Sequence, residues 1–491
     1  MADVSLNAGL DDDDLIDLEN DTPHLQNDAI VSTIDIGDIP EVDYETKRIA
    51  EDSRALEDLL HVCEDIAKAN GMSQKFALEA MGVMKNFDGG RSVGYYSKDV
   101  TATRYKTSME SLGGAVWALL QAGINYAIAL VRKILNWVSA LVNGSNLTGK
   151  KLAASVEKRT GDDLRIVKAT SDELGKVIAQ AGKLDKACEG VDIRSVSGFT
   201  SQPESFDQLV EMVLGDQPNK DAANAFLMGN DPFFYDFVTN GPYVSIIKEN
   251  ASAVQLIVDV LGLKIEGTAK LVEALEQNPT ESTIYQAQLT ITKLITPLSI
   301  GTGQKLDTVQ RLAEKIEKVR IEVAGTTPSK KLSLTEAIKA VQDMYDNGPL
   351  HDVIESKREI AMKLSEMEET LLKLRDAADS LTPVNNPVSE ESQRQLADML
   401  RACIEMLQSD TLAAARLMAQ FHHYQMTTTN LARRVLRLTE NTAKTIRNAV
   451  KGSQNAKFLQ EAEILAKAAG SAPLAQLMKE LMEKRFDGSD F

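Results

Sequence analysis

Seven apolar residues in the last third of the chain recur at alternating spacings of four and three, and this pattern constrains the fold more than any other feature. The seven are Ile360, Leu364, Met367, Leu371, Leu374, Ala378 and Leu381. A repeat of 3.5 residues places them along one side of a helix, as in coiled-coil packing. Unbranched residues that favour helices are abundant, whereas aromatic residues make up only 5%. We therefore predict an all-α protein, an elongated multi-helix bundle with long, antiparallel, coiled-coil-like helices.

The N-terminal segment differs from the rest of the chain in its charge. Residues 1–46 contain 14 Asp and Glu and no Lys or Arg. Because 58 acidic and all 54 basic residues follow this segment, the formal net charge of −18 falls to −4 without it. Few large apolar side chains are present there to offset the entropy of ordering the segment. We predict that residues 1–45 form a disordered acidic leader.

The remaining sequence divides into three predicted helical regions. These are a helical region at 46–150, a helical globular region at 151–302, and a long-helix bundle or coiled-coil hairpin at 303–491. The loop at 382–387 contains two prolines, so the heptad helix should end before it. The next helix is expected to run from 389 to about 450 with little interruption, which would complete an antiparallel hairpin.

The most apolar segment, residues 113–143, contains both tryptophans of the chain. The 17 residues from Ala115 to Val131 carry no charge, which is near the lower limit of length for crossing a bilayer. The residues expected to make the contacts of this helix are Trp117, Leu120, Ile124, Val131, Leu135 and Trp137. A central core helix explains them most simply, because Gln121 and Asn125 would be costly in lipid. Conditional membrane insertion and an oligomer interface are the alternatives.

Five basic residues are predicted to share one face of the C-terminal long helix. They are Arg433, Arg437, Lys444, Arg447 and Lys451, with Glu440 interrupting the row. A row of cations can neutralise DNA phosphates or receive an acidic segment such as the leader. An ordinary solvated face is the simpler interpretation, because no nucleic-acid-binding motif accompanies the row.

No motif indicates catalysis or a bound cofactor. The segment Gly144–Lys151 resembles a phosphate-binding loop, but Lys151 stands where that loop needs Ser or Thr. His422 and His423 point about 100° apart on a helix and cannot easily share a metal, so we expect an ordinary helix surface there. Buried free thiols are expected at all three cysteines, which are Cys63, Cys188 and Cys403. We predict a protein that is not an enzyme and that has no cofactor or metal.

The order of these features resembles that of internal head proteins of large tailed bacteriophages, including inner-body and ejected proteins. The likeness covers the layout of most of the chain: an acidic leader, an apolar Trp-containing helix, and long helices without catalytic motifs. It implies a virion structural protein that is made in the host bacterial cytoplasm, lies inside the head and is ejected with the genome. The implied partners are other head proteins or further copies of the chain, packaged DNA at the basic helix face, and conditionally a membrane.

The resemblance also implies proteolytic maturation, because proteins of this group are trimmed after Glu in a small-x-Glu motif. Matching tripeptides end at Glu57, Glu79, Glu110 and Glu157. Cleavage after Glu57 would remove 17 acidic and 3 basic residues, which would reduce the repulsion between the chain and packaged DNA.

Two other functions fit parts of the sequence. An α-helical pore-forming protein would insert residues 113–143 into a membrane. A cytoplasmic coiled-coil scaffold would instead use the apolar repeats at 309–323 and 360–381 to form a stable oligomer.

Overall fold

The fold is all-α in every part that the computed structural model describes, which confirms the predicted all-α class. The described residues are 48–49, 51–61, 109–143, 149–188, 204–215, 232–251, 254–276, 307–326, 333–380, 390–407, 409–449 and 456–470. The predicted disordered leader lies outside these residues, as do Glu79 and Lys451.

The described helices range from the 7-residue α8 to the 41-residue α16. Their bounds are α4 Met109–Asn143, α5 Gly149–Cys188, α6 Phe206–Gly215, α8 Pro232–Val238, α9 Pro242–Ala251, α10 Val254–Glu276, α12 Asp307–Ala324, α13 Leu334–Asp346, α14 Leu350–Ser380, α15 Glu390–Met406, α16 Ser409–Ala449 and α17 Ala456–Gly470. Residues 51–61 form a further helical segment, helix 51–61. At about 1.5 Å per residue, the 41-residue α16 is about 60 Å long.

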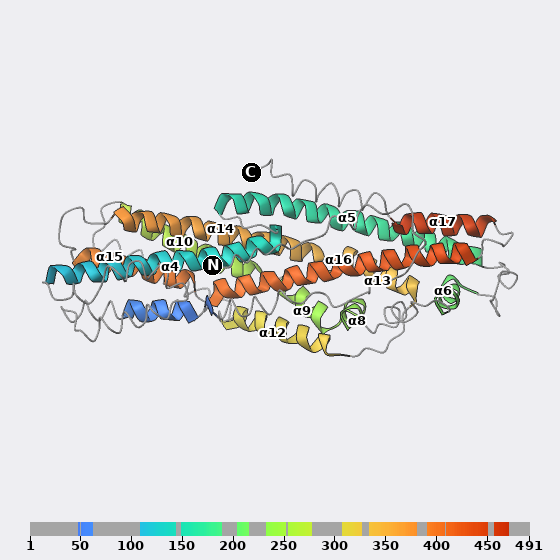
Figure 1. Ribbon diagram of the computed structural model, residues 1–491, viewed down its shortest axis with the longest axis horizontal. Helices are drawn as coiled ribbons and strands as arrows, with labels where there is room; N and C mark the ends of the chain where they lie inside the picture. The colour runs from blue at the N-terminus through green and yellow to red at the C-terminus, as the bar shows by residue number, and fades with distance from the viewer. Residues whose placement is uncertain are drawn as a thin grey trace, which may run out of the picture.

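These helices form an elongated bundle whose long axis most of them follow (Figure 1). At one end α4 packs against α14 and α15, and at the other end α16 and α5 pack against α17. α4 and α14 are antiparallel, because Gln121 bonds to Asp379 while Arg132, further along α4, bonds to Glu368. α14 runs toward one end of the bundle, and α15 and α16 return along it (Figure 1).

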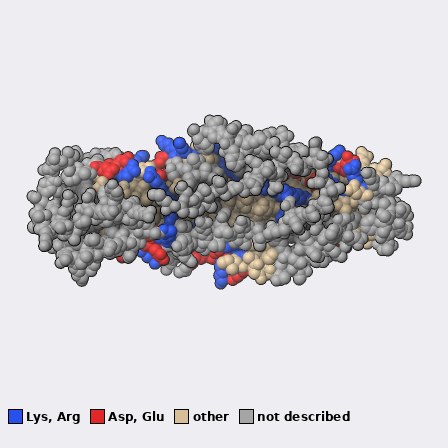
Figure 2. Space-filling view, viewed as in Figure 1, with Lys and Arg blue, Asp and Glu red and all other residues tan. Residues whose placement is uncertain are grey.

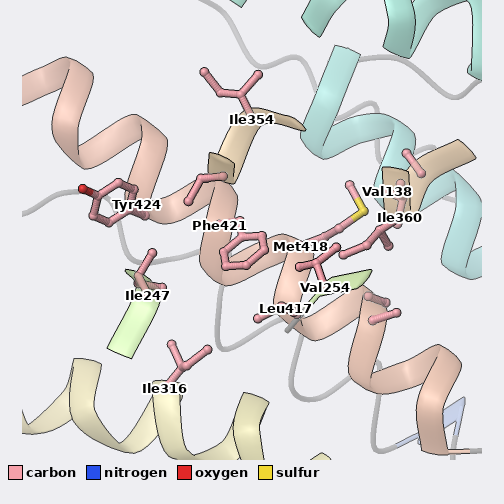
Figure 3. Packing of buried hydrophobic residues seen from close by; sticks show 14 of the residues in the cluster. Val138, Ile247, Val254, Ile316, Ile354, Ile360, Leu417, Met418, Phe421 and Tyr424 are labelled. Carbon is pink, nitrogen blue, oxygen red and sulfur yellow. The ribbon is translucent and has the colours of Figure 1, made fainter. Parts of the chain in front are cut away.

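Helices from all three predicted regions contribute to one hydrophobic core. The core cluster contains buried residues from helix 51–61 through α17. Near its centre, the apolar side chains of α16 meet those of α4, α9, α10, α12 and α14 (Figure 3). The labelled residues there are Val138, Ile247, Val254, Ile316, Ile354, Ile360, Leu417, Met418, Phe421 and Tyr424. The three predicted regions are therefore packed together rather than stacked end to end in the described part of the chain.

The heptad repeat that begins at Ile360 lies on α14. Six of its seven residues are at most 1% exposed, and Leu381 lies outside the described residues. α14 packs against α10, α5, α16 and α4, so its apolar side faces several helices in turn. The burial of this side is as predicted, whereas pairing with a single partner helix, as in a two-stranded coiled coil, stays a prediction.

The helix expected from 389 to about 450 is interrupted near residue 407. α15 ends at Met406, where the backbone N–H of Leu407 bonds to the carbonyl of Ile404 at 2.9 Å and tightens the last turn. The hydroxyl of Thr411, which is fully buried, donates to the carbonyl of Met406 at 2.6 Å. These bonds satisfy backbone groups that the interruption leaves without helical partners.

The N-terminus of α13 is closed by a capping box. The Ser333 hydroxyl accepts a bond from the Glu336 N–H at 3.2 Å, and the Glu336 carboxylate accepts one from the Ser333 N–H at 3.0 Å. We expect Ser333→Ala to lower the free energy of unfolding by about 1 kcal/mol, because it leaves one N–H of the first turn without its partner. Urea unfolding measures this, with the exposed Lys339→Ala on the same helix as control. Equal unfolding midpoints for the two variants would contradict it.

The two described cysteines are buried free thiols, as predicted for them. Burial raises the pKa of Cys188 and of Cys403 to about 12, with Asp185 also raising that of Cys188. Cys63 lies outside the described residues.

Candidate functional site

A buried cluster of polar side chains crosses the middle of the bundle, and we call it the central polar cluster. Its members are Arg159, Asp163, Tyr243, Glu317, Arg320, Lys357, Gln420, His422, His423 and Gln425. The two adjacent histidines of α16 hold its two halves together, because they point to different sides of the helix.

The expectation of an ordinary helix surface at the histidine pair was wrong. His423 is 6% exposed, and His422 is partly buried. The reason is that α16 has neighbours on more than one side, with α14 beside it and α12 against another face. Two adjacent histidines on such a helix point toward neighbouring helices rather than toward solvent alone.

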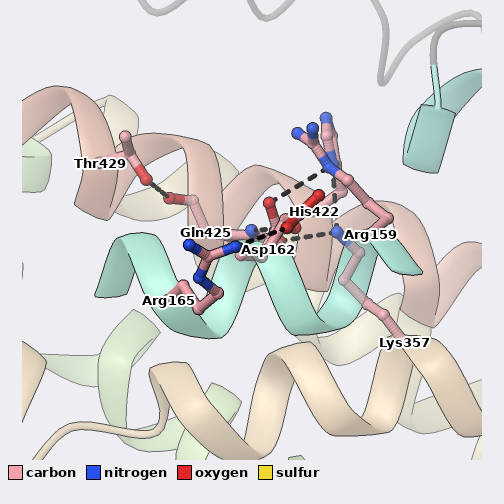
Figure 4. Close-up of polar contacts among 8 residues, drawn as sticks. Arg159, Asp162, Arg165, Lys357, His422, Gln425 and Thr429 are labelled. Carbon is pink, nitrogen blue, oxygen red and sulfur yellow. Dashed lines mark hydrogen bonds and ion pairs between the residues drawn. The ribbon is translucent and has the colours of Figure 1, made fainter. Parts of the chain in front are cut away.

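The first half of the cluster joins α16 to α14 and α5 (Figure 4). The Lys357 ammonium lies 3.3 Å from Nδ1 of His422 and donates to Oε1 of Gln425 at 2.7 Å. The Gln425 amide in turn donates to Oδ2 of Asp163 at 2.8 Å. The Arg159 Nε atom lies 3.1 Å from the other Asp163 oxygen. The Asp163 carboxylate therefore contacts Arg159 and Gln425 directly and also acts on the charge of Lys357.

Burial controls the charge states in this half. The pKa of Lys357 is lowered to about 8, chiefly by burial, with Asp163 raising it and Arg159 lowering it. The pKa of His422 is lowered to about 3, first by burial and then by Lys357, Arg159 and His423. At neutral pH the lysine is mostly charged and the histidine is neutral, so the ammonium donates to a free imidazole nitrogen.

The second half joins α16 to α9. The Tyr243 hydroxyl and Nδ1 of His423 share a hydrogen bond at 2.9 Å, and both side chains are buried. Phe233 of α8 packs edge-on against both rings, at centroid distances of 5.8 Å from Tyr243 and 5.6 Å from His423. The pKa of His423 is lowered to about 4, first by burial and then by Arg320, while Glu317 acts in the opposite direction. The His423 ring is thus held neutral in a largely aromatic setting.

α12 contributes a buried ion pair to the same half. Arg320, which is 4% exposed, places Nη2 at 2.5 Å from Oε1 and Nε at 3.2 Å from Oε2 of Glu317. The Gln420 amide of α16 donates to the same carboxylate at 2.5 Å. Glu317 therefore links α12 to α16 while neutralising the arginine.

The turn between α8 and α9 positions Tyr243. Both carboxylate oxygens of Asp236 accept backbone bonds at the start of α9, from the N–H of Tyr243 at 3.3 Å and of Val244 at 3.1 Å. Asn240 has a positive φ of 48°, and Gly241 follows it. A Cβ atom on Gly241 would lie 2.1 Å from the Asp236 carboxylate, so only glycine fits. The described part of residues 229–243 consists of α8, this turn and the start of α9.

We expect Gly241→Ala to lower the free energy of unfolding by about 2 kcal/mol or more, because the methyl group displaces the Asp236 cap. The measurement is urea unfolding followed by circular dichroism. Gly262→Ala is a matched control, since a Cβ atom at that helical glycine meets nothing within 4 Å. The account of this turn fails if both glycine variants have the same unfolding midpoint.

The central polar cluster connects α16 to the helices around it. Five of its hydrogen bonds run between side chains of different helices, which fixes the rotation and the axial register of α16. No group of three or more side chains able to hold a metal ion occurs among the residues that the structure describes.

Several members of the cluster were missed from the sequence, although a signal was present. Lys357 precedes Ile360 by three residues and follows Val353 by four, so it occupies a position on the apolar side of α14. Asp163 lies three residues after Thr160 and seven before Thr170, both buried on α5. A charged residue in phase with a buried helix face needs a partner in the core, and this was the available clue.

The apolar segment 113–143 lies in α4. Leu120, Ile124, Val131 and Leu135 are buried in the core, and Trp137 is partly buried against it. The side chain of Trp117 lies outside the described residues. This burial favours the core-helix interpretation. Within the described part of the chain, no helix combines the length and the apolar character that a membrane span requires.

The described candidate processing sites lie in helices. Glu57 belongs to helix 51–61, where its neighbour Leu56 is fully buried, and Glu110 lies in the first turn of α4. Glu157 is exposed on α5, where its carboxylate lies 3.4 Å from Nη1 of Arg358. Cleavage after any of the three stays a prediction, and it would require local unfolding of a helix.

The predicted basic row lies on the C-terminal half of α16, and its four described members are exposed. The row is partly neutralised, because Lys444 pairs with Glu440 at 2.6 Å and Arg447 with Glu463 of α17 at 3.4 Å. Arg437 has no ion pair within the described part of the chain. In Figure 2, Lys and Arg side chains lie close to Asp and Glu side chains in the region of α17. DNA contact at this face stays a prediction.

Comparison with known proteins gave no match to a family model, to a curated protein or to a solved structure.

Proposed function

We propose that this chain is a non-enzymatic virion structural protein, internal to the head of a large tailed bacteriophage. The observation that carries the structural role is the elongated bundle, in which helices from 51 to 470 share one hydrophobic core. The phage head as its location rests on the sequence layout.

The central polar cluster supports the same role. Its side chains bond to one another across α5, α9, α12, α14 and α16. Networks of this kind specify one arrangement of the helices. The acidic leader would act during assembly, when it repels DNA, and the body that follows is nearly neutral.

The test is to purify particles of the phage that encodes the chain and to identify their proteins by mass spectrometry before and after external protease treatment. An internal protein is present and survives the protease until the heads are broken by osmotic shock. Absence from the particles overturns the proposal. Digestion in intact particles overturns the interior location alone.

A pore-forming function is the alternative that the same preparation can address. Dye-loaded liposomes of anionic and neutral lipids should stay intact with the purified chain, because the described part of α4 is packed in the core. Dye release would favour the membrane alternative. A stable oligomer in sedimentation, together with absence from particles, would favour the coiled-coil scaffold.

A further inference from the structure

We propose that the His422–His423 pair is an acid-sensitive joint, at which protonation separates α16 from α14 and α5 on one side and from α9 and α12 on the other. The two rings are adjacent in sequence and lie in different surroundings, so one change in pH acts on both interfaces.

In the contact between His422 and Lys357, only one of the two facing nitrogens can carry a proton that points at the other. With the ammonium 3.3 Å from Nδ1, a second proton would place two donors and two positive charges against each other. Arg159 adds a third cation from α5. The carboxylate of Asp163 acts on Lys357 and is already engaged by Arg159 and Gln425. Protonation of His422 therefore favours separation of α16 from α14.

Among the residues that the structure describes, His423 has no acceptor for a second N–H. Its Nδ1 shares the bond with Tyr243, and its buried Nε2 has no hydrogen-bond partner in that part of the chain. The charged groups facing it from α12 are Arg320, which repels an imidazolium, and Glu317, which attracts one but is already paired with the arginine. From α8, the carboxyl of Asp236 is bound to the backbone of α9.

The direction of the pH effect follows from comparing two states. In the closed state both rings are buried, and in the open state α16 has separated from its neighbours and the rings are exposed. Both histidines have pKa values lowered by burial in the closed bundle, whereas an exposed histidine has a pKa of about 6.5. The open state therefore takes up protons that the closed state does not, so closure is fully favourable above about pH 6.5 and weakens as the pH falls below it. Lys357 acts in a separate window above pH 8. Burial raises the pKa of Asp236, which opposes the histidines and reduces the net proton uptake.

Hydrogen exchange with mass spectrometry tests the joint on the full chain, after correction for the intrinsic pH dependence of exchange. Between about pH 6 and 5, protection of amides in α9, α12 and the centre of α16 should fall about tenfold per pH unit for each histidine, hence up to about a hundredfold for both. His422→Gln and His423→Gln should each reduce this slope to about one proton, and the double variant should abolish it. A wild-type slope near zero, or an unchanged slope in the double variant, overturns the proposal.

A second measurement avoids the variants altogether. In NMR spectra of the full chain with isotope-labelled histidine, two of the five histidine signals should show no titration between pH 8 and 5.5. His351, whose side chain is 67% exposed, provides an internal reference for a solvated ring. Titration of all five rings near pH 6.5 would overturn the joint even if the Gln variants fail to fold.

Discussion

Glu317→Leu is expected to lower the free energy of unfolding by about 3–5 kcal/mol, the range for breaking a buried ion pair from one side. The substitution leaves the Arg320 guanidinium buried without the carboxylate that binds it through two nitrogens. It also removes the acceptor of the Gln420 amide, which connects α12 to α16. Urea unfolding followed by circular dichroism gives the change.

Two controls separate this effect from ordinary loss of charge. The double variant Glu317→Leu/Arg320→Met should recover more than half of the lost stability, because no uncompensated charge remains in the core. Glu322→Leu removes an exposed carboxylate from the same helix, 3.8 Å from Lys318, and should change stability little. A loss of less than about 1 kcal/mol for Glu317→Leu would mean that the arginine finds another partner or reaches water.

Phe421→Ala is expected to lower the free energy of unfolding by about 3–5 kcal/mol, the usual cost of removing a phenyl ring from a packed core. Phe421 is fully buried in the N-terminal third of α16, among side chains of several helices (Figure 3). The resulting cavity would be lined by side chains of several helices, so it can close only if these helices move relative to one another. The same urea experiment measures the loss.

Met426→Ala on the same helix is the matched control, since its side chain is 41% exposed. We expect it to change stability by no more than about 0.5 kcal/mol. Equal unfolding midpoints for Phe421→Ala and Met426→Ala would contradict the packing of Phe421 in a hydrophobic core.

The helices themselves were predictable because their apolar residues recur at the helical period. The heptad on α14 is buried where it is described, as its spacing indicated, and Leu120, Ile124, Val131 and Leu135 of α4 are buried as well. Periodicity reports which side of a helix is apolar, and it does not report which helix covers that side. The packing of α14 against α10 and α5 could therefore not be derived from the repeat alone.

The candidate site was harder to predict for a related reason. His422 and His423 were considered as metal ligands and as surface residues, because their spacing on one helix was the available information. Their actual partners, Lys357 and Tyr243, are 65 and 180 residues away in the chain. Lys357 lies on the apolar side of α14, which signals a buried cation. Which residue pairs with this lysine depends on the order of helices around the core.

The break between α15 and α16 shows a further limit of sequence reasoning. No proline or glycine occurs at 406–411, so propensity alone predicts a continuous helix there. The interruption allows α15 to pack against α4 while α16 packs against α12 and α17. Tertiary packing thus outweighs the local preference of the chain.

The most direct test of the structural role inside a phage head is the intact mass and N-terminal sequence of the chain isolated from purified, protease-treated particles. We predict that the chain is present and protected, with the acidic leader removed by cleavage after one of the candidate glutamates. A start after Glu57 would place that cut before helix 51–61 packs, because Leu56 is buried in the folded bundle. An intact N-terminus would contradict maturation by cleavage, and absence of the chain from the particles would contradict the whole account.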